Sequence, residues 1–155
     1  MEPSTAPVSR AEPPPVPAPW PGVIYFAGVF GAGFVLGPIR VLWLVPQVGV
    51  RTAELVEAPV MLAVIVVAAQ WVVRRCRVPP RPRPRLGMGL LALLLLAIAE
   101  LSFADAMLGL SPWAYVTSRD PVAGPVHAAS VLFFALAPCA VVRKRDARTE
   151  PARVL

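Results

Sequence analysis

The sequence is poor in the residues from which most enzyme active sites are built. Its 155 residues include two cysteines and one histidine. They show no zinc-binding spacing, and the chain has neither a phosphate-binding glycine loop nor a nucleophile elbow. Cys76 and Cys139 are both expected near the cytoplasmic side, where thiols stay reduced, which argues against a disulfide and against a two-cysteine metal site. We therefore predict a protein that is not an enzyme and that binds no cofactor and no metal.

Charged residues are scarce as well. They make up 15% of the chain, whereas 57% of it is hydrophobic and the mean hydropathy is +0.65. This composition is too apolar for an ordinary soluble fold and indicates a membrane protein. A net charge of +6 would suggest nucleic acid as the partner of a soluble protein. Here eleven of the fifteen basic residues lie within residues 74–85 and 143–153, so we expect no nucleic-acid partner.

Long apolar runs are abundant. A span needs about 20 apolar residues to cross about 30 Å of hydrocarbon. Four runs meet this length once Asp120 is taken as a helix N-cap with Pro121 in the first turn. The sequence predicts an all-α fold, a four-helix transmembrane bundle with spans over approximately residues 22–44, 55–73, 86–110 and 121–142. Residues 1–21 are expected to form a disordered Pro-rich cytoplasmic tail, and residues 143–155 a basic cytoplasmic tail.

A short helix is predicted between the third and fourth spans. Ser111 followed by Pro112 is a helix-start signal. Trp113 and Tyr115 are expected to face lipid, and Arg119 to face water. These residues therefore predict an interfacial helix that lies along the outer surface and leads into the last span.

The arginine distribution predicts the orientation. The connection between spans two and three holds six arginines and the C-terminal tail five basic residues, whereas the other two connections hold one each. Because basic residues gather in cytoplasmic connections, both rich segments and the N-terminus are expected inside. Attraction of anionic lipids to the same segment is an alternative use. The predicted cytoplasmic basic anchor consists of Arg74, Arg75, Arg77, Arg81, Arg83 and Arg85.

Three stretches of the sequence resemble a group of small four-span bacterial integral membrane proteins for which no activity is known. They are GFVLGPIRVLWLVPQVG, TAELVEAPVML and SPWAYVTSRDPVAGPV, within residues 25 to 142. The resemblance implies a multi-pass protein of the bacterial inner membrane. It implies no catalytic activity.

Each predicted span contains an ionisable residue at a similar depth. Counted at 1.5 Å per residue, these residues lie ~21 to ~25 Å from the cytoplasmic ends of the spans. We interpret them as an intramembrane polar layer, because charges in hydrocarbon are costly unless paired or hydrated. One alternative is a structural ion network in which Arg40 bridges Glu57 and Glu100, with His127 as hydrogen-bond partner. A second is a proton or ion site, and a third is that the charged side chains extend independently to the membrane surface. The layer consists of Arg40, Glu57, Glu100 and His127.

Small residues and prolines also mark the spans. Small residues at four-residue spacing in the first span let another helix approach closely, either within the chain or in a homo-oligomer. The pairs are Ala27 and Gly31, Gly28 and Ala32, and Gly33 and Gly37, and the glycines predicted to pack are Gly28, Gly31, Gly33 and Gly37. Prolines inside three spans should each leave the carbonyl four residues earlier without its helical partner. The affected carbonyls are those of Phe34 before Pro38, Leu55 before Pro59 and Phe134 before Pro138.

Taken together, these features favour a non-enzymatic accessory or structural membrane component whose protein partners the sequence does not identify. The alternative function is a small transporter or channel that handles protons or ions through the polar layer. Lipid is the one partner that the sequence predicts directly.

Overall fold

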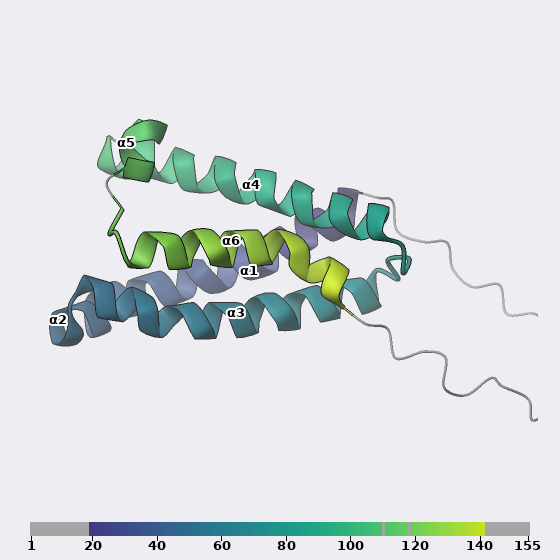
Figure 1. Ribbon diagram of the computed structural model, residues 1–155, viewed down its shortest axis with the longest axis horizontal. Coiled ribbons are helices and arrows are strands. Elements are labelled where there is room, and N and C mark those ends of the chain that lie inside the picture. Colours follow the sequence, from purple (N-terminus) through teal and green to yellow (C-terminus); the bar gives the residue numbers. More distant parts are fainter. Residues whose placement is uncertain (1–18, 110, 118, 142–155) are drawn as a thin grey trace, which may run out of the picture.

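The computed structural model describes residues 19–109, 111–117 and 119–141. Within them the chain is helical (Figure 1). Helix α1, Pro19–Ile39, continues through a π-helical segment η1, Arg40–Leu44, into the short α2, Val45–Val48. Helices α3, Val50–Arg75, and α4, Pro82–Leu108, follow. The short α5, Pro112–Thr117, then leads to α6, Ala123–Ala140.

The predicted fold class is confirmed. Four helices of membrane length pack together, and a short helix lies between the third and the fourth. The long helices are apolar on all sides, and large hydrophobic side chains such as Phe34, Val67 and Leu94 are more than half exposed. By helix length and composition, the chain is a multi-pass membrane protein. Residues 1–18 and 142–155, most of the two predicted tails, lie outside the described residues.

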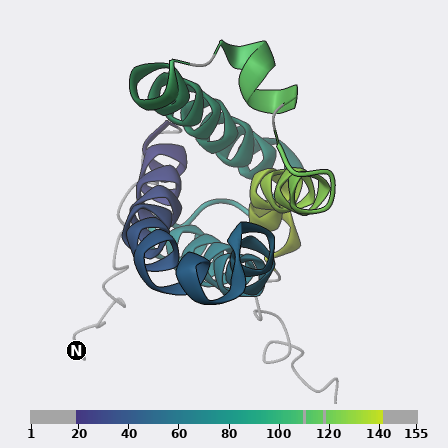
Figure 2. The same ribbon diagram turned by 90° about the vertical axis from the view of Figure 1, so that its left-hand side faces the viewer.

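The four long helices stand at the corners of a four-sided bundle (Figure 2). Helices α1 and α6 each pack against both α3 and α4, whereas the backbones of the diagonal pairs stay further apart. The start of α1, the end of α6 and the connection between α3 and α4 share one end of the bundle (Figure 1). Helices α2 and α5 lie at the other end, which we call the α2/α5 end.

The packed core occupies the half of the bundle near the α3–α4 connection. Its buried side chains come from the first half of α1, the second half of α3, the start of α4 and the end of α6. They include Tyr25, Ile65, Val72, Met88, Ala92 and Phe134. Among the residues whose burial is described, those buried at the α2/α5 end are few and small, such as Ala53, Ala104 and Ala123.

Glycine allows the closest helix approach. A Cβ atom added to Gly89 of α4 would lie 1.9 Å from the carbonyl oxygen of Ala135 in α6. A backbone oxygen cannot move aside as a flexible side chain can, so only glycine fits at this position. At Gly22 of α1 the corresponding distance to the carbonyl oxygen of Met88 is 3.0 Å. The tight contacts of α1 and α6 with α4 therefore lie in the packed half of the bundle.

Candidate functional site: a charged rim above an apolar cavity

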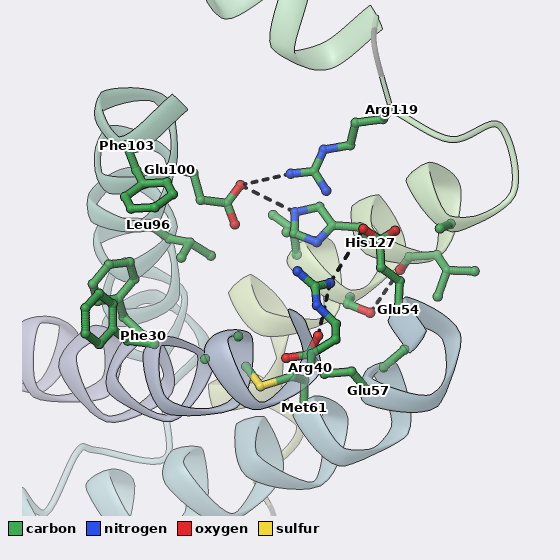
Figure 3. A pocket seen from close by; sticks show the side chains of 18 of the residues that line it. Phe30, Arg40, Glu54, Glu57, Met61, Leu96, Glu100, Phe103, Arg119 and His127 are labelled. Carbon is green, nitrogen blue, oxygen red and sulfur yellow. Dashed lines mark hydrogen bonds and ion pairs between the residues drawn. The ribbon is translucent and has the colours of Figure 1, made fainter. Parts of the chain in front are cut away.

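A cavity of about 1110 Å³ lies between the four long helices, in the loosely packed half of the bundle. Its deep part is apolar and ends near the packed core. The deep lining includes Val29, Phe30, Met61, Ile65, Leu96 and Phe134. Towards the α2/α5 end the lining becomes charged (Figure 3). We call this part the charged rim; its members are Arg40, Glu54, Glu57, Glu100, Arg119, Asp120 and His127.

Arg40 is paired with two carboxylates of α3. Its Nη1 lies 3.1 Å from Oε2 of Glu57 and 3.5 Å from Oε1 of Glu54. The two glutamates are three residues apart, so they lie on one face of α3. All three side chains line the cavity and are 17–31% exposed. This group ties the end of α1 to α3.

The π-helical segment η1 sets the position of Arg40. The amide of Val45 donates to the carbonyl of Arg40, five residues earlier, instead of to the carbonyl of Val41. Pro46 follows immediately, and its ring would clash with the carbonyl of Leu42 in a regular α-helix. A wider turn relieves that clash, and such turns occur often at functional sites. Gly49, with φ of +80°, then ends α2 and reverses the chain into α3.

A second group surrounds Glu100 of α4. Its Oε2 lies 3.4 Å from Nε2 of His127 in α6 and 3.6 Å from Nη2 of Arg119. Arg119 also donates a hydrogen bond to the Tyr115 hydroxyl, and its guanidinium lies 4.6 Å from the centre of that ring. Burial, together with the nearby Glu100 carboxylate, raises the pKa of Tyr115. This group connects α4, α5 and α6 (Figure 3).

A third pair closes the rim between α3 and α6. Arg51 donates to both carboxylate oxygens of Asp120, with nitrogen–oxygen distances of 2.8 to 3.1 Å. Oδ1 of Asp120 also accepts hydrogen bonds from the amides of Val122 and Ala123, so Asp120 caps the start of α6. These hydrogen bonds, first those from Arg51, lower the pKa of Asp120 from 3.8 to about 2.

The four residues of the predicted polar layer all line the cavity, but they form two separate groups. Arg40 pairs with Glu57 as the structural interpretation expected, and its second partner is Glu54 in place of Glu100. Glu100 pairs instead with His127 and Arg119. Depth along the span does not single out Glu54, although its spacing of three residues from Glu57 places both on one helical face. Tyr115 and Arg119, expected on the lipid and water sides, both line the cavity.

The predicted packing glycines of α1 mostly face open space. A Cβ atom at Gly28, Gly31 or Gly37 would meet no atom within 4 Å, and one at Gly33 would lie 3.6 Å from Cε of Met61. Close approach of another helix to these glycines stays a prediction. Within the described chain the tightest helix contacts are those at Gly22 and Gly89.

The predicted basic anchor divides into two kinds of arginine. Five of the six side chains are exposed around the α3–α4 connection. Arg85 is only 6% exposed, and its Nη1 donates to the carbonyl of Val141 at the end of α6. A cation at this position satisfies a carbonyl that the helix end leaves unpaired. Arg85 thus links α4 to α6. The exposed members are Arg74, Arg75, Arg77, Arg81 and Arg83.

No known protein supplies a function by similarity. No family model, no curated protein and no solved structure matches the chain. Among the residues that the structure describes, no cluster of three or more histidine, cysteine or acidic side chains is arranged to hold a metal ion. Function must therefore be argued from the charged rim and the cavity.

Proposed function

We propose that this protein is a non-enzymatic accessory component of the bacterial inner membrane. The observation that carries the proposal is the pairing in the charged rim. Arg40 binds Glu54 and Glu57, Glu100 binds His127 and Arg119, and Asp120 binds Arg51. Each group joins different helices at the end where apolar packing is weakest. Partnered charges that join different helices support a structural clamp.

The proposal includes an orientation with the α3–α4 connection and both tails in the cytoplasm. Five exposed arginines surround that connection, and basic residues favour the cytoplasmic side. The same arginines are placed to attract anionic lipids at that surface. The α2/α5 end and the charged rim then belong to the outer half of the membrane. The open glycines of α1 leave a homo-oligomer as a further proposal.

Site-directed labelling tests this orientation. In a C76A/C139A background, Gln47→Cys and Arg81→Cys place single thiols at exposed positions of opposite ends of the bundle. A membrane-impermeant maleimide should label Q47C in intact cells and R81C only after the membrane is opened. The reverse pattern would refute the proposed orientation.

A proton- or ion-handling role is the second candidate. It is favoured by one observation: Glu100 and His127 lie 3.4 Å apart on the wall of an open cavity, and ionisable residues within membrane spans often mark ion or proton pathways. Purified protein in liposomes discriminates between the two functions. The accessory role predicts no proton or cation flux at any pH from 5 to 8. A flux that Glu100→Gln abolishes would establish the transport role instead.

A further inference from the structure

The cavity combines an apolar depth with a charged mouth. Val29 of α1 and Arg40 of η1 both line it, and the eleven helical steps from one to the other correspond to ~16 Å. Ligand pockets in proteins typically measure about 300 to 1,000 Å³, so a volume of about 1110 Å³ accommodates an organic molecule of substantial size. A molecule that fills such a space favourably has an apolar chain at one end and a polar group at the other.

The charges of the rim indicate the sign of that polar group. Glu100 faces Arg119, and Asp120 faces Arg51, so each of these two acid–arginine pairs is balanced in charge. In the Arg40 group, one guanidinium faces two carboxylates. That group therefore carries one net negative charge when both glutamates are ionised. A single positive charge beside Glu54 and Glu57 would neutralise the Arg40 group.

The carboxylates have capacity for a further partner. Arg40 contacts Oε1 of Glu54 and Oε2 of Glu57, through the same nitrogen. Each ionised carboxylate has two acceptor oxygens, so one oxygen of each glutamate remains beyond these contacts. Both side chains lie at the cavity wall and keep 17–31% exposure. Figure 3 shows both glutamates beside Arg40, and their second oxygens are the acceptors that an ammonium group would use.

We propose that the cavity binds a cationic amphiphile, with its positive group beside Glu54 and Glu57 and its apolar chain along Phe30, Ile65 and Phe134. The ammonium replaces lost water by charge-assisted contact with the carboxylates. The apolar chain gains van der Waals contacts with the cavity wall, because within a membrane its alternative is lipid that is equally apolar. Binding in this mode fills the space that the helices leave open in the loosely packed half.

Titration calorimetry on the full chain in micelles of an uncharged maltoside detergent tests the proposal, with empty micelles as baseline. Dodecylammonium, whose nitrogen can donate hydrogen bonds, is the probe, and dodecanoate provides a tail of similar length with the opposite charge. We expect saturable binding of the cation, at least about tenfold tighter than that of the anion, which corresponds to ~1.4 kcal/mol. Equal binding of the two probes would overturn the proposal.

Variants locate the bound molecule. E54Q/E57Q should weaken binding of the cation at least about tenfold, whereas Asp105→Asn, an exposed acid of α4 outside the cavity lining, should leave it unchanged. Gly33→Leu should block the apolar part of the cavity, since Gly33 lines it beside the flexible end of Met61. Gly28→Leu, on open surface of the same helix, is its control. Unchanged binding in both E54Q/E57Q and G33L would overturn the proposal even if one variant folded poorly.

Competition identifies the natural source of the cation. Phosphatidylethanolamine carries an ammonium group, whereas phosphatidylglycerol carries none. Displacement of the probe by the first lipid alone supports a membrane lipid as occupant. Absence of displacement by either lipid supports a soluble cationic amphiphile. Displacement by phosphatidylglycerol alone would contradict the charge argument and overturn the proposal.

Discussion

The hydroxyl of Tyr25 donates a hydrogen bond to the carbonyl oxygen of Phe134, 2.9 Å away, and the two rings stack with centroids 4.6 Å apart. Phe134 precedes Pro138 by four residues, and proline has no amide hydrogen with which to pair that carbonyl. Tyr25, from the diagonally opposite helix α1, supplies the missing donor. In a membrane interior an unpaired carbonyl is costly, so this contact stabilises a proline inside α6.

Tyr25→Phe should therefore destabilise the fold. The substitution keeps the stacked ring and leaves the buried carbonyl of Phe134 without its donor, at an expected cost of ~1–3 kcal/mol. The measurement is the free energy of unfolding in mixed micelles.

Pro138→Ala provides the matched test of the cause. Alanine restores an amide that can pair with the Phe134 carbonyl, so Y25F should cost less in the P138A background than in the natural sequence. An equal cost in both backgrounds would contradict the claim that Tyr25 replaces the donor that Pro138 lacks.

Only one partner of the contact between Tyr25 and Phe134 is predictable from the sequence. Proline at position 138 predicts a free carbonyl at Phe134 from local geometry alone. The donor is 109 residues away in the chain, and no local pattern points to Tyr25. Local rules predict which backbone groups lack partners, whereas the packing of the four helices decides which side chain reaches them.

Gly89→Ala should be strongly unfavourable. The added methyl would lie 1.9 Å from the Ala135 carbonyl oxygen, which forces α4 and α6 apart. Overpacking of this kind typically costs ~1–3 kcal/mol, in spite of the higher helix propensity of alanine.

Gly87→Ala, two residues earlier on α4, is the control, because its Cβ would meet no atom within 4 Å. It should be neutral or stabilising by up to ~1 kcal/mol. Thermal stability in detergent distinguishes the two variants. Equal effects at positions 87 and 89 would contradict the close approach of α4 and α6.

The Arg51–Asp120 pair predicts a pH dependence at the acid end. The pKa of Asp120 is about 2 in the folded protein, below its ordinary value of 3.8, because Arg51 and two backbone amides donate to the carboxylate. A lowered folded-state pKa stabilises the fold above pH 3.8, and this stabilisation is lost as the pH falls to about 2.

Asp120→Asn should remove that contribution. Between pH 3.8 and about 2 the variant should lose less stability than the natural protein, as measured by acid unfolding in detergent. Asp105→Asn, which changes an exposed acid outside the rim, should keep the natural loss. The same acid sensitivity in D120N would rule out the pair as its source.

The charged rim was only partly predictable for a physical reason. Counting residues along each span gives the depth of a side chain, and depth brought Arg40, Glu57, Glu100 and His127 to one layer. Which residues pair depends on the direction in which each side chain leaves its helix. The π-helical segment Arg40–Leu44 changes that direction for Arg40. A regular period of 3.6 residues does not describe that turn, so the sequence predicted the layer without the two groups into which it divides.

The most direct test of the proposed clamp is a double-mutant cycle on Arg40 and Glu57. Arg40→Gln leaves two glutamates facing each other without a cation, so it should reduce the free energy of unfolding by ~1.5–3 kcal/mol. In R40Q/E57Q one of those charges is gone, so the double variant should be more stable than the sum of the two single effects predicts. Unfolding in mixed micelles at neutral pH provides all four values. A coupling of at least ~0.5 kcal/mol confirms that Arg40 holds α1 to α3 through Glu57, whereas strictly additive effects would contradict the clamp.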